Sequence, residues 1–320
     1  WQSSLLSMFM SNTATAAMMI AILVPVLAAM PDSDNKGRVG LALSIPVAAN
    51  IGGIGSPIGT PPNVVAVGWL EKAGISISFG SWMLVMVPVA MLILFFAWIF
   101  LCKMFPTKQE SIEVKLEGSV DKSPKAIIVY VTFAVTIFLW VFGKELFGVN
   151  ANVVALIPFA VFCITGVFEK KDLGKIDWDV LWLVAGGFAL GVGLEGKIGP
   201  DGMTMSKHIV SAIPFDTWST LMLIIGSGVL CLVMSTFMSN SATAALLIPI
   251  FVALAQGAGM DEKLAPYGGT TTLIVGLALS ASFAMSLPIS TPPNAIAYSK
   301  GFIKQKEMAM VGIFVGIISL

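Results

Sequence analysis

The chain has 320 residues, of which 57% are hydrophobic and only 11% are charged, and its formal net charge is zero. An ordinary soluble domain has about 25% charged residues, so this composition excludes a soluble globule with a polar surface. The apolar content also excludes a disordered protein, and the balanced charge with a single Arg excludes a nucleic-acid binder. Three cysteines without paired spacing exclude a disulfide scaffold and disfavour a zinc site.

Apolar runs of about 20 residues recur along the chain and predict an all-α polytopic membrane protein. Four of these runs are interrupted, at 11–13, 50–57, 239–241 and 286–294, and the only long polar linker is 107–122. Four tryptophans near predicted span ends are expected to be interfacial anchors: Trp69, Trp82, Trp178 and Trp218. In chain order the predicted spans are 8–29, 37–70, 81–103, 125–142, 153–168, 179–193, 218–256 and 264–300, and a last span begins at 308.

An internal repeat organises these interruptions. The heptad SNTATAA at 11–17 returns as SNSATAA at 239–245, and PIGTPPN at 57–63 returns as PISTPPN at 288–294. The two offsets, 228 and 231 residues, are nearly equal. Chance does not readily place two ordered heptads at one offset, so the sequence predicts two structural repeats.

Each Ser-Asn interruption predicts a re-entrant helical hairpin, and each Thr-Pro-Pro-Asn interruption predicts a broken transmembrane helix. Between the hairpins we count five crossings, which end at residues 72, 104, 142, 168 and 195. This odd number predicts inverted repeats, as in many secondary transporters. Thirteen of the 18 basic residues then fall on the face where the first hairpin opens, so that face is predicted to be cytoplasmic and the C-terminus external.

The interruptions carry Ser, Asn and Thr but no charge, and all 18 Asp and Glu map to connectors or span ends. This pattern disfavours a proton relay, which usually needs an intramembrane acid. Helix N-termini attract anions, and unwound carbonyl groups supply oxygen for Na⁺. An uncharged site would bind an anion together with a cation, so we expect obligatory cation coupling. Pro61 and Pro292 are expected to begin new half-helices.

Two other interpretations were weighed. Small polar residues also serve helix packing in membranes, and that interpretation suits Asn50, Asn150 and Asn152, which lie outside the repeated motifs. A hydrolase that uses a hairpin serine lacks the His, Lys or Asp at mid-membrane depth that would activate the serine.

The paired Ser-Asn and Thr-Pro-Pro-Asn motifs resemble the divalent anion/sodium symporter family, whose members are sodium-coupled carriers of dicarboxylates, citrate or sulfate. The segment SFAMSLPISTPPN at 282–294 is similar to that family's signature, with Met285 where Phe is usual. The resemblance implies a transporter and not an enzyme, located in the cell membrane, homodimeric and working by an elevator motion.

The resemblance also implies a division of the chain. Residues 1–78 would form the second arm of the first hairpin and the first broken helix, and further helices would precede them. Residues 79–168 would be mainly scaffold, 169–216 a connecting span and an interfacial helix, 217–304 the second hairpin and broken helix, and 305–320 the start of a last span.

The resemblance finally implies the binding residues. At least two Na⁺ ions would bind, the first to Ser7, Ser11, Asn12 and Gly59, and the second to Ser235, Met238, Asn240 and Ser290. The substrate would contact Ser11, Asn12, Thr13, Thr60, Ser239, Asn240, Ser241, Thr291 and Pro292. The expected function is Na⁺-coupled symport of a divalent anion, with a C4-dicarboxylate such as succinate or malate as the first choice. A citrate or sulfate carrier and an anion exchanger are the alternatives.

Overall fold

The computed structural model describes residues 1–107, 109, 121–176, 178–197, 202–205, 208, 218–257 and 260–320. Most of the predicted polar linker, and much of the predicted interfacial helix before 217, lie outside the described residues. Within the described part the chain is helical and forms no strand, only an isolated bridge between Lys197 and Thr204. The expected all-α membrane architecture is therefore confirmed.

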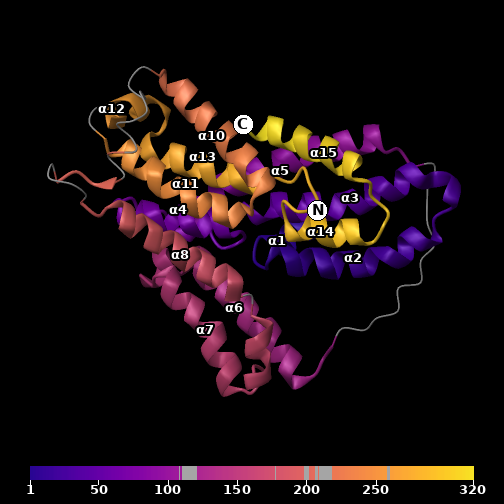
Figure 1. Cartoon of the computed structure of the whole chain (residues 1–320). Helices are drawn as coiled ribbons and strands as arrows, with labels where there is room; N and C mark the ends of the chain where they lie inside the picture. The colour runs from indigo at the N-terminus through magenta and orange to yellow at the C-terminus, as the bar shows by residue number, and fades with distance from the viewer. Residues whose placement is uncertain are drawn as a thin grey trace.

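The helices follow the chain as Figure 1 labels them. Short 3-10 turns occupy Asp32–Asp34, Lys170–Lys175 and Ala265–Tyr267. The α-helices are α1 (Gln2–Ser7), α2 (Asn12–Ala29), α3 (Asn35–Gly53), α4 (Pro61–Lys72), α5 (Phe79–Met104), α6 (Pro124–Phe147), α7 (Ala151–Ile164), α8 (Trp178–Leu194), α10 (Thr220–Phe237), α11 (Asn240–Ala255), α12 (Met260–Leu264), α13 (Gly269–Ser282), α14 (Pro292–Ser299) and α15 (Gln305–Ser319).

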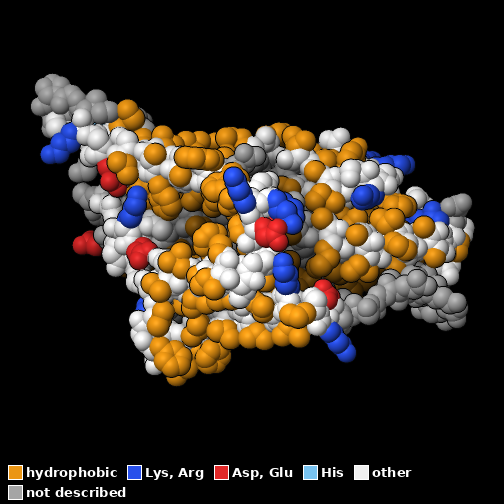
Figure 2. Space-filling view, turned by 90° about the horizontal axis from the view of Figure 1, so that it is seen from below, with side chains coloured by type: hydrophobic (Ala, Val, Ile, Leu, Met, Phe, Trp, Pro, Cys, Tyr) orange, Lys and Arg blue, Asp and Glu red, His pale blue; other side chains and the backbone are white. Residues whose placement is uncertain are grey.

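Four of the described helices are long and apolar enough to cross a membrane, namely α2, α5, α6 and α10. Helices α7, α11 and α13 are apolar but shorter, with 14 to 16 residues. Many large side chains on α5, α6 and α7 are exposed, among them Leu84, Phe142 and Leu156. Figure 2 shows a group of charged side chains near the middle of one face and hydrophobic side chains spread over much of the rest. Such a surface suits contact with lipid.

The N-terminal and C-terminal parts of the chain pack in matching ways. Helices α1 and α2 both pack on α3, and α10 and α11 both pack on α13. The two sets also exchange contacts, because α14 packs on α2 and α3 while α4 packs on α11 and α13. Helices α6 and α7 form a pair that projects away from this body (Figure 1). The repeated segments of the two halves are therefore in contact with each other.

The four interruptions are real breaks between helices, although their bounds differ from the prediction. The first comes after Ser7, and the short helix α1 precedes it. The second was predicted at 50–57, which is wrong at its start, because α3 continues through Asn50 to Gly53. Glycine usually weakens a helix, but Gly52 and Gly53 are tolerated here because each lies in a close contact that would exclude a side chain.

Two of the four predicted tryptophan anchors are instead part of the core. Trp69 and Trp82 are each only 2% exposed. The indole nitrogen of Trp82 donates to the carbonyl oxygen of Ile54 at 2.9 Å, at the second break. The ring of Trp69 fits against Gly191 of α8, where a Cβ atom would lie 1.8 Å from the ring. Gly191 thus leaves space for the ring of Trp69, although the position of Trp69 near a span end predicts an interfacial residue.

Candidate functional site

The first break gathers neutral oxygen atoms around Asn12, the first residue of α2. Ser7 is fully buried, and its hydroxyl donates to the carbonyl oxygen of Ala49 at 2.8 Å and is hydrogen-bonded to the Asn12 side chain. The amide of Asn12 also lies 3.2 Å from the carbonyl oxygens of Ala49 and Gly59. When the amide oxygen faces inward, this cluster holds only oxygens, a ligand set that suits a hard cation. With the nitrogen inward, the amide donates to the same carbonyl groups.

The second half repeats this arrangement around Asn240, the first residue of α11. Ser235 is fully buried, and its hydroxyl lies 2.8 Å from the amide oxygen of Asn240 and 2.9 Å from the carbonyl oxygen of Ala281. The amide nitrogen of Asn240 donates to the carbonyl oxygen of Ser282 at 3.5 Å. The structure therefore brings together the serine and asparagine that each expected Na⁺ site shares. The carbonyl groups of Ala49 and Ala281 also belong to these clusters, although no sequence pattern marks either residue.

The other expected Na⁺ ligands lie close in the chain to these clusters. Ser290 is buried, and its hydroxyl donates at 2.7 Å to the carbonyl oxygen of Thr236, the residue after Ser235. Met238 directly follows α10 and is 40% exposed. Ser11 is exposed, and its hydroxyl caps α2 by accepting from the Ala14 N–H at 3.1 Å.

Two glycines allow the chain to close around Asn12. A Cβ atom on Gly53 would lie 2.6 Å from the Asn12 amide oxygen, and one on Gly59 would lie 2.3 Å from the carbonyl oxygen of Gly53. Both distances are far below van der Waals contact. Gly59, which is expected near the first Na⁺, is therefore also needed for steric reasons. The same holds for Gly53, which the sequence did not single out.

The expected substrate residues stand at helix N-termini. Ser239 is exposed and caps α11 by accepting from the Ala242 N–H at 3.1 Å, as Ser11 caps α2. The neighbouring Thr13 and Ser241 are partly exposed. Thr60 and Thr291 precede α4 and α14, and each is 3% exposed. Pro61 and Pro292 are the first residues of these helices, as predicted, and Pro292 is exposed. The N-termini of α2 and α11 thus place backbone N–H groups beside the oxygen clusters, whereas α4 and α14 each begin with two prolines, which have no N–H.

The asparagines of the two Thr-Pro-Pro-Asn motifs hold the unwound segments together. The Asn63 side-chain nitrogen donates to the carbonyl oxygens of Ser56 at 2.8 Å and Gly53 at 3.3 Å. That of Asn294 donates to Met285 at 2.7 Å and Leu287 at 3.0 Å. Buried carbonyl groups outside a helix need such partners. The repeat had marked both asparagines, but their role as tethers emerges only from the structure.

Asn50 lies outside the repeated motifs, and the sequence predicts only a packing role for it. Its side-chain nitrogen lies 3.1 Å from the Thr291 hydroxyl and 3.3 Å from the amide oxygen of Asn294. Asn50 is 1% exposed and follows Ala49, whose carbonyl group belongs to the first oxygen cluster. It therefore joins the first half of the chain directly to the second Thr-Pro-Pro-Asn break.

Matching threonines near the two clusters have unsatisfied hydroxyl groups. Thr15 and Thr243 lie three residues after Asn12 and Asn240, and both are fully buried. Neither hydroxyl has a hydrogen-bond partner within the part of the chain that the structure describes. Buried polar groups are normally satisfied, so this pair marks both helix starts as unusually polar.

The site carries no titratable group. The described residues contain no cluster of three or more His, Cys, Asp or Glu that would suit a metal ion. A transition metal therefore has no ligand set in the described part of the chain, whereas neutral oxygens suit an alkali ion.

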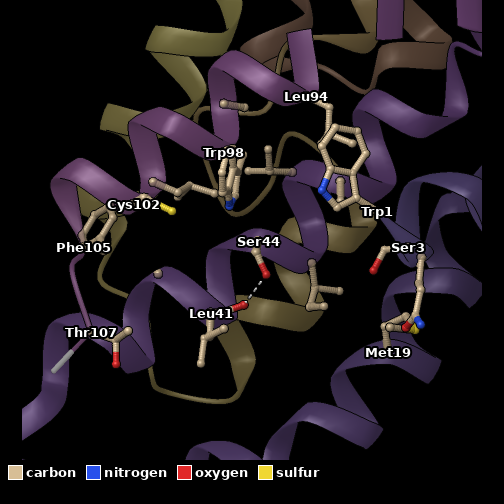
Figure 3. Close-up of a pocket in the computed structure, with 18 of the residues that line it drawn as sticks. Trp1, Ser3, Met19, Leu41, Ser44, Leu94, Trp98, Cys102, Phe105 and Thr107 are labelled. Atoms are coloured by element: carbon tan, nitrogen blue, oxygen red, sulfur yellow. Dashed lines mark hydrogen bonds between the residues drawn. The ribbon is translucent and has the colours of Figure 1, made fainter. Parts of the chain in front are cut away.

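A cavity lies elsewhere in the structure. It has a volume of about 800 Å³ and lies between α1, α3 and α5. Figure 3 shows Trp1, Ser44, Trp98 and Cys102 around it, with Ser44 donating to the carbonyl oxygen of Leu41 at 2.7 Å. The lining includes none of the Ser-Asn or Thr-Pro-Pro-Asn residues. Cavity size therefore does not point to the same place as the repeated motifs.

Comparison with known proteins decides the family. A model of the citrate transporter family matches residues 2–270. The chain belongs to this citrate transporter family. This membership confirms the expectation of a transporter and not an enzyme. Sodium-dependent relatives confirm the expected relationship to sodium-coupled anion carriers.

Three relatives of the chain are named as transporters. The chain is 32% identical to an uncharacterized transporter of Haemophilus influenzae, over 99% of this chain and 68% of the relative. It is 32% identical to the sodium-dependent high-affinity dicarboxylate transporter 3 of Caenorhabditis elegans, over 99% of this chain and 64% of the relative. The sodium-dependent dicarboxylate transporter of Staphylococcus saprophyticus is 29% identical, over 98% of this chain and 65% of its own length. The chain thus spans about two thirds of these relatives.

Proposed function

We propose that this chain is the site-bearing part of a secondary active transporter that couples the import of a divalent anion to Na⁺. The observation that carries the proposal is the pair of matching neutral oxygen clusters, Ser7 with Asn12 and Ala49, and Ser235 with Asn240 and Ala281. Each lies at the start of a helix whose free N–H groups favour an anion. Two related Caenorhabditis and Staphylococcus proteins are named as sodium-dependent dicarboxylate transporters, which supports a C4-dicarboxylate such as succinate or malate.

The two clusters are proposed to hold one Na⁺ each, so at least two ions move with each anion. A sodium ion in a cluster of neutral oxygens leaves net positive charge beside the helix N-termini. The anion then binds where it meets both the ion and the N–H groups, which explains how a site without Lys or Arg can select a dianion. The substrate is proposed to contact the residues that the resemblance implied: Ser11, Asn12, Thr13, Thr60, Ser239, Asn240, Ser241, Thr291 and Pro292.

Movement of the site across the membrane is proposed to follow an elevator scheme in a homodimer. Helices α1–α4, α10, α11, α13 and α14 would form the moving domain, because they pack on one another through both halves. Helices α5–α7 would supply scaffold. Helix α8 packs on α4 and α11, so we assign this connecting span to the moving domain. The first hairpin is proposed to open to the cytoplasm and the C-terminus to lie outside.

The test is uptake of labelled succinate into proteoliposomes with Na⁺ or K⁺ outside. We expect uptake with Na⁺ only. Asn12→Ala and Asn240→Ala should each reduce uptake at least about tenfold, because each removes a cation ligand and leaves buried polar groups without a hydrogen-bond partner. Asn152→Ala is the matched control, since Asn152 lies at the start of α7, away from both clusters. Full uptake by both cluster variants would contradict the site assignment.

Citrate is the second candidate substrate, because the matching family is described as citrate transporters. Competition of succinate uptake by citrate, malate and sulfate separates these substrates. Uptake that needs an anion on the opposite side, and no Na⁺ gradient, would instead favour an exchanger.

A further inference from the structure

We propose that Asn50 is a positioning residue for the anion, because it forces the Thr291 hydroxyl to act as a hydrogen-bond donor. This inference rests on the proposed function. Thr291 belongs to the second half of the chain, whereas Asn50 belongs to α3 in the first half, 241 residues earlier.

The hydrogen-bond directions follow from two backbone groups that can act only as acceptors. The carbonyl oxygens of Met285 and Leu287 can only accept, so the Asn294 side chain turns its nitrogen toward them, at 2.7 and 3.0 Å. Its amide oxygen is then left to face Asn50 at 3.3 Å. An amide oxygen can only accept, so Asn50 must present its nitrogen there. The opposite orientation of Asn50 would place two oxygens against each other.

The same Asn50 nitrogen faces the Thr291 hydroxyl at 3.1 Å and donates its second proton to it. The Thr291 oxygen also accepts from the Asn294 backbone N–H at 3.3 Å, as the N-cap of α14. A hydroxyl has two acceptor positions and one proton, and both acceptor positions are now filled. Only the proton remains, so Thr291 can donate to an anion but cannot serve a cation as a ligand.

The first half lacks this arrangement. Thr60, the counterpart of Thr291, makes no side-chain cap bond to α4. On α13, the segment that corresponds to Asn50 carries Ala281 and Ser282, and the Ser282 hydroxyl donates within its own helix to Ala278 at 2.9 Å. Asn50 therefore breaks the symmetry of the repeats. The second Thr-Pro-Pro-Asn break therefore offers the anion a hydroxyl donor that Asn50 orients, and the first break has no corresponding contact among the described residues.

The experiment is a double-mutant cycle in the full chain, with Asn50→Leu, Thr291→Val and the double variant. Leu keeps the branched shape of Asn without its hydrogen-bonding groups, although it is larger, and Val matches Thr without its hydroxyl. Succinate and Na⁺ affinities are measured separately by thermal shift, Na⁺ without any anion. Each single variant should weaken succinate binding by about tenfold, since a hydrogen bond to a charged group is lost, and leave Na⁺ affinity unchanged. The double variant should also lose about tenfold, because both changes remove the same donor.

Other outcomes decide against the proposal in distinguishable ways. Losses that multiply in the double variant, or an equal loss of Na⁺ affinity in Asn50→Leu, would overturn the role of Asn50 while leaving the transporter assignment intact. Absence of Na⁺-dependent succinate binding in the unaltered chain would overturn both. Asn50→Ala serves as the second variant if Asn50→Leu does not fold, and it should give the same tenfold loss for succinate alone.

Discussion

Gly53 and Gly59 show how single residues decide whether the first oxygen cluster can form. The Asn12 amide fills the space where a side chain of residue 53 would begin, and the carbonyl group of Gly53 fills the corresponding space at residue 59. The cluster thus depends on the absence of two Cβ atoms as much as on the presence of its oxygens.

We predict that Gly53→Ala greatly weakens Na⁺ binding. The added methyl group would lie 2.6 Å from the Asn12 amide oxygen and push that side chain away from Ser7 and Ala49. Gly276→Ala is the matched control, because Gly276 lies inside α13 with no atom within 4 Å of its Cβ position. Thermal shift with increasing Na⁺ checks this, with Gly276→Ala expected to bind as the unaltered chain does. Equal Na⁺ affinity in both variants would show that the cluster tolerates the displacement.

At this scale the sequence predicts only the residues that the repeat duplicates. Asn12 and Asn240 stand out because their motifs recur, and the structure places each beside the serine expected. Asn50 does not recur, and its partners are more than 200 residues away, so no local pattern identifies it. Ala49 and Ala281 contribute only backbone carbonyl groups, and any residue type would supply these.

Helix starts were the elements easiest to predict, because their signals are local. Pro61 and Pro292 have no N–H to lose in a first turn, and Ser11 and Ser239 cap the turns that follow them. Helix ends were harder. Helix α3 continues past the expected break at Asn50 to Gly53, because tertiary contacts outweigh the weak helix propensity of its glycines.

Two glycines of α8 allow this helix to pack closely on α4 and α11. Gly187 faces Ala245 of α11, and Gly191 faces the Trp69 ring of α4. Lys72 lies over the rings of Trp69 and Phe188, at 4.3 and 4.9 Å from their centres. A Trp at a span end is usually an anchor, and only the partner helix reveals that this one is buried.

We predict that Gly191→Ala destabilises the protein by about 2–3 kcal/mol, the cost typical of overpacking a core. Its Cβ would lie 1.8 Å from the Trp69 ring, and neither the ring nor the helix backbone can move without repacking α4. Gly186→Ala, on the same helix with nothing within 4 Å of its Cβ position, should be neutral or slightly stabilising. Unfolding temperatures in detergent compare the two. A similar temperature for both variants would mean that α8 does not pack on Trp69 in the membrane.

For the molecule as a whole, the two halves are not independent units. Helix α14 of the second half packs on α2 and α3, and α4 of the first half packs on α11 and α13. The sequence predicted two repeats but not this exchange, because the pairing of distant segments depends on three-dimensional packing. The exchange matters for coupling, since displacement of one break must disturb helices that carry the other cluster.

Charge distribution over the whole molecule leads to a prediction about pH. The expected site residues include no Asp, Glu, His or Lys. In the connector after α7, Glu169 pairs with Lys171 at 2.8 Å and with Lys125 at 3.5 Å. The hydrogen bond and charge of Lys171 lower the pKa of the Glu169 carboxyl group below its usual 4.5. This pair therefore contributes stability above the unfolded pKa, and that contribution is lost only as the pH falls through the lower folded value.

We therefore predict that Na⁺ binding without any anion has the same affinity, within about twofold, between about pH 6.5 and pH 8. No group in the Asn12 or Asn240 cluster gains or loses a proton in this range, and the lowered pKa of Glu169 keeps that carboxylate ionised throughout it. Sodium titrations by thermal shift at several pH values check this, with the anion omitted because its own protonation would confuse the result. An affinity that rises steadily with pH would mean that a proton competes with Na⁺, and an acidic residue beyond the described clusters would then have to belong to the site.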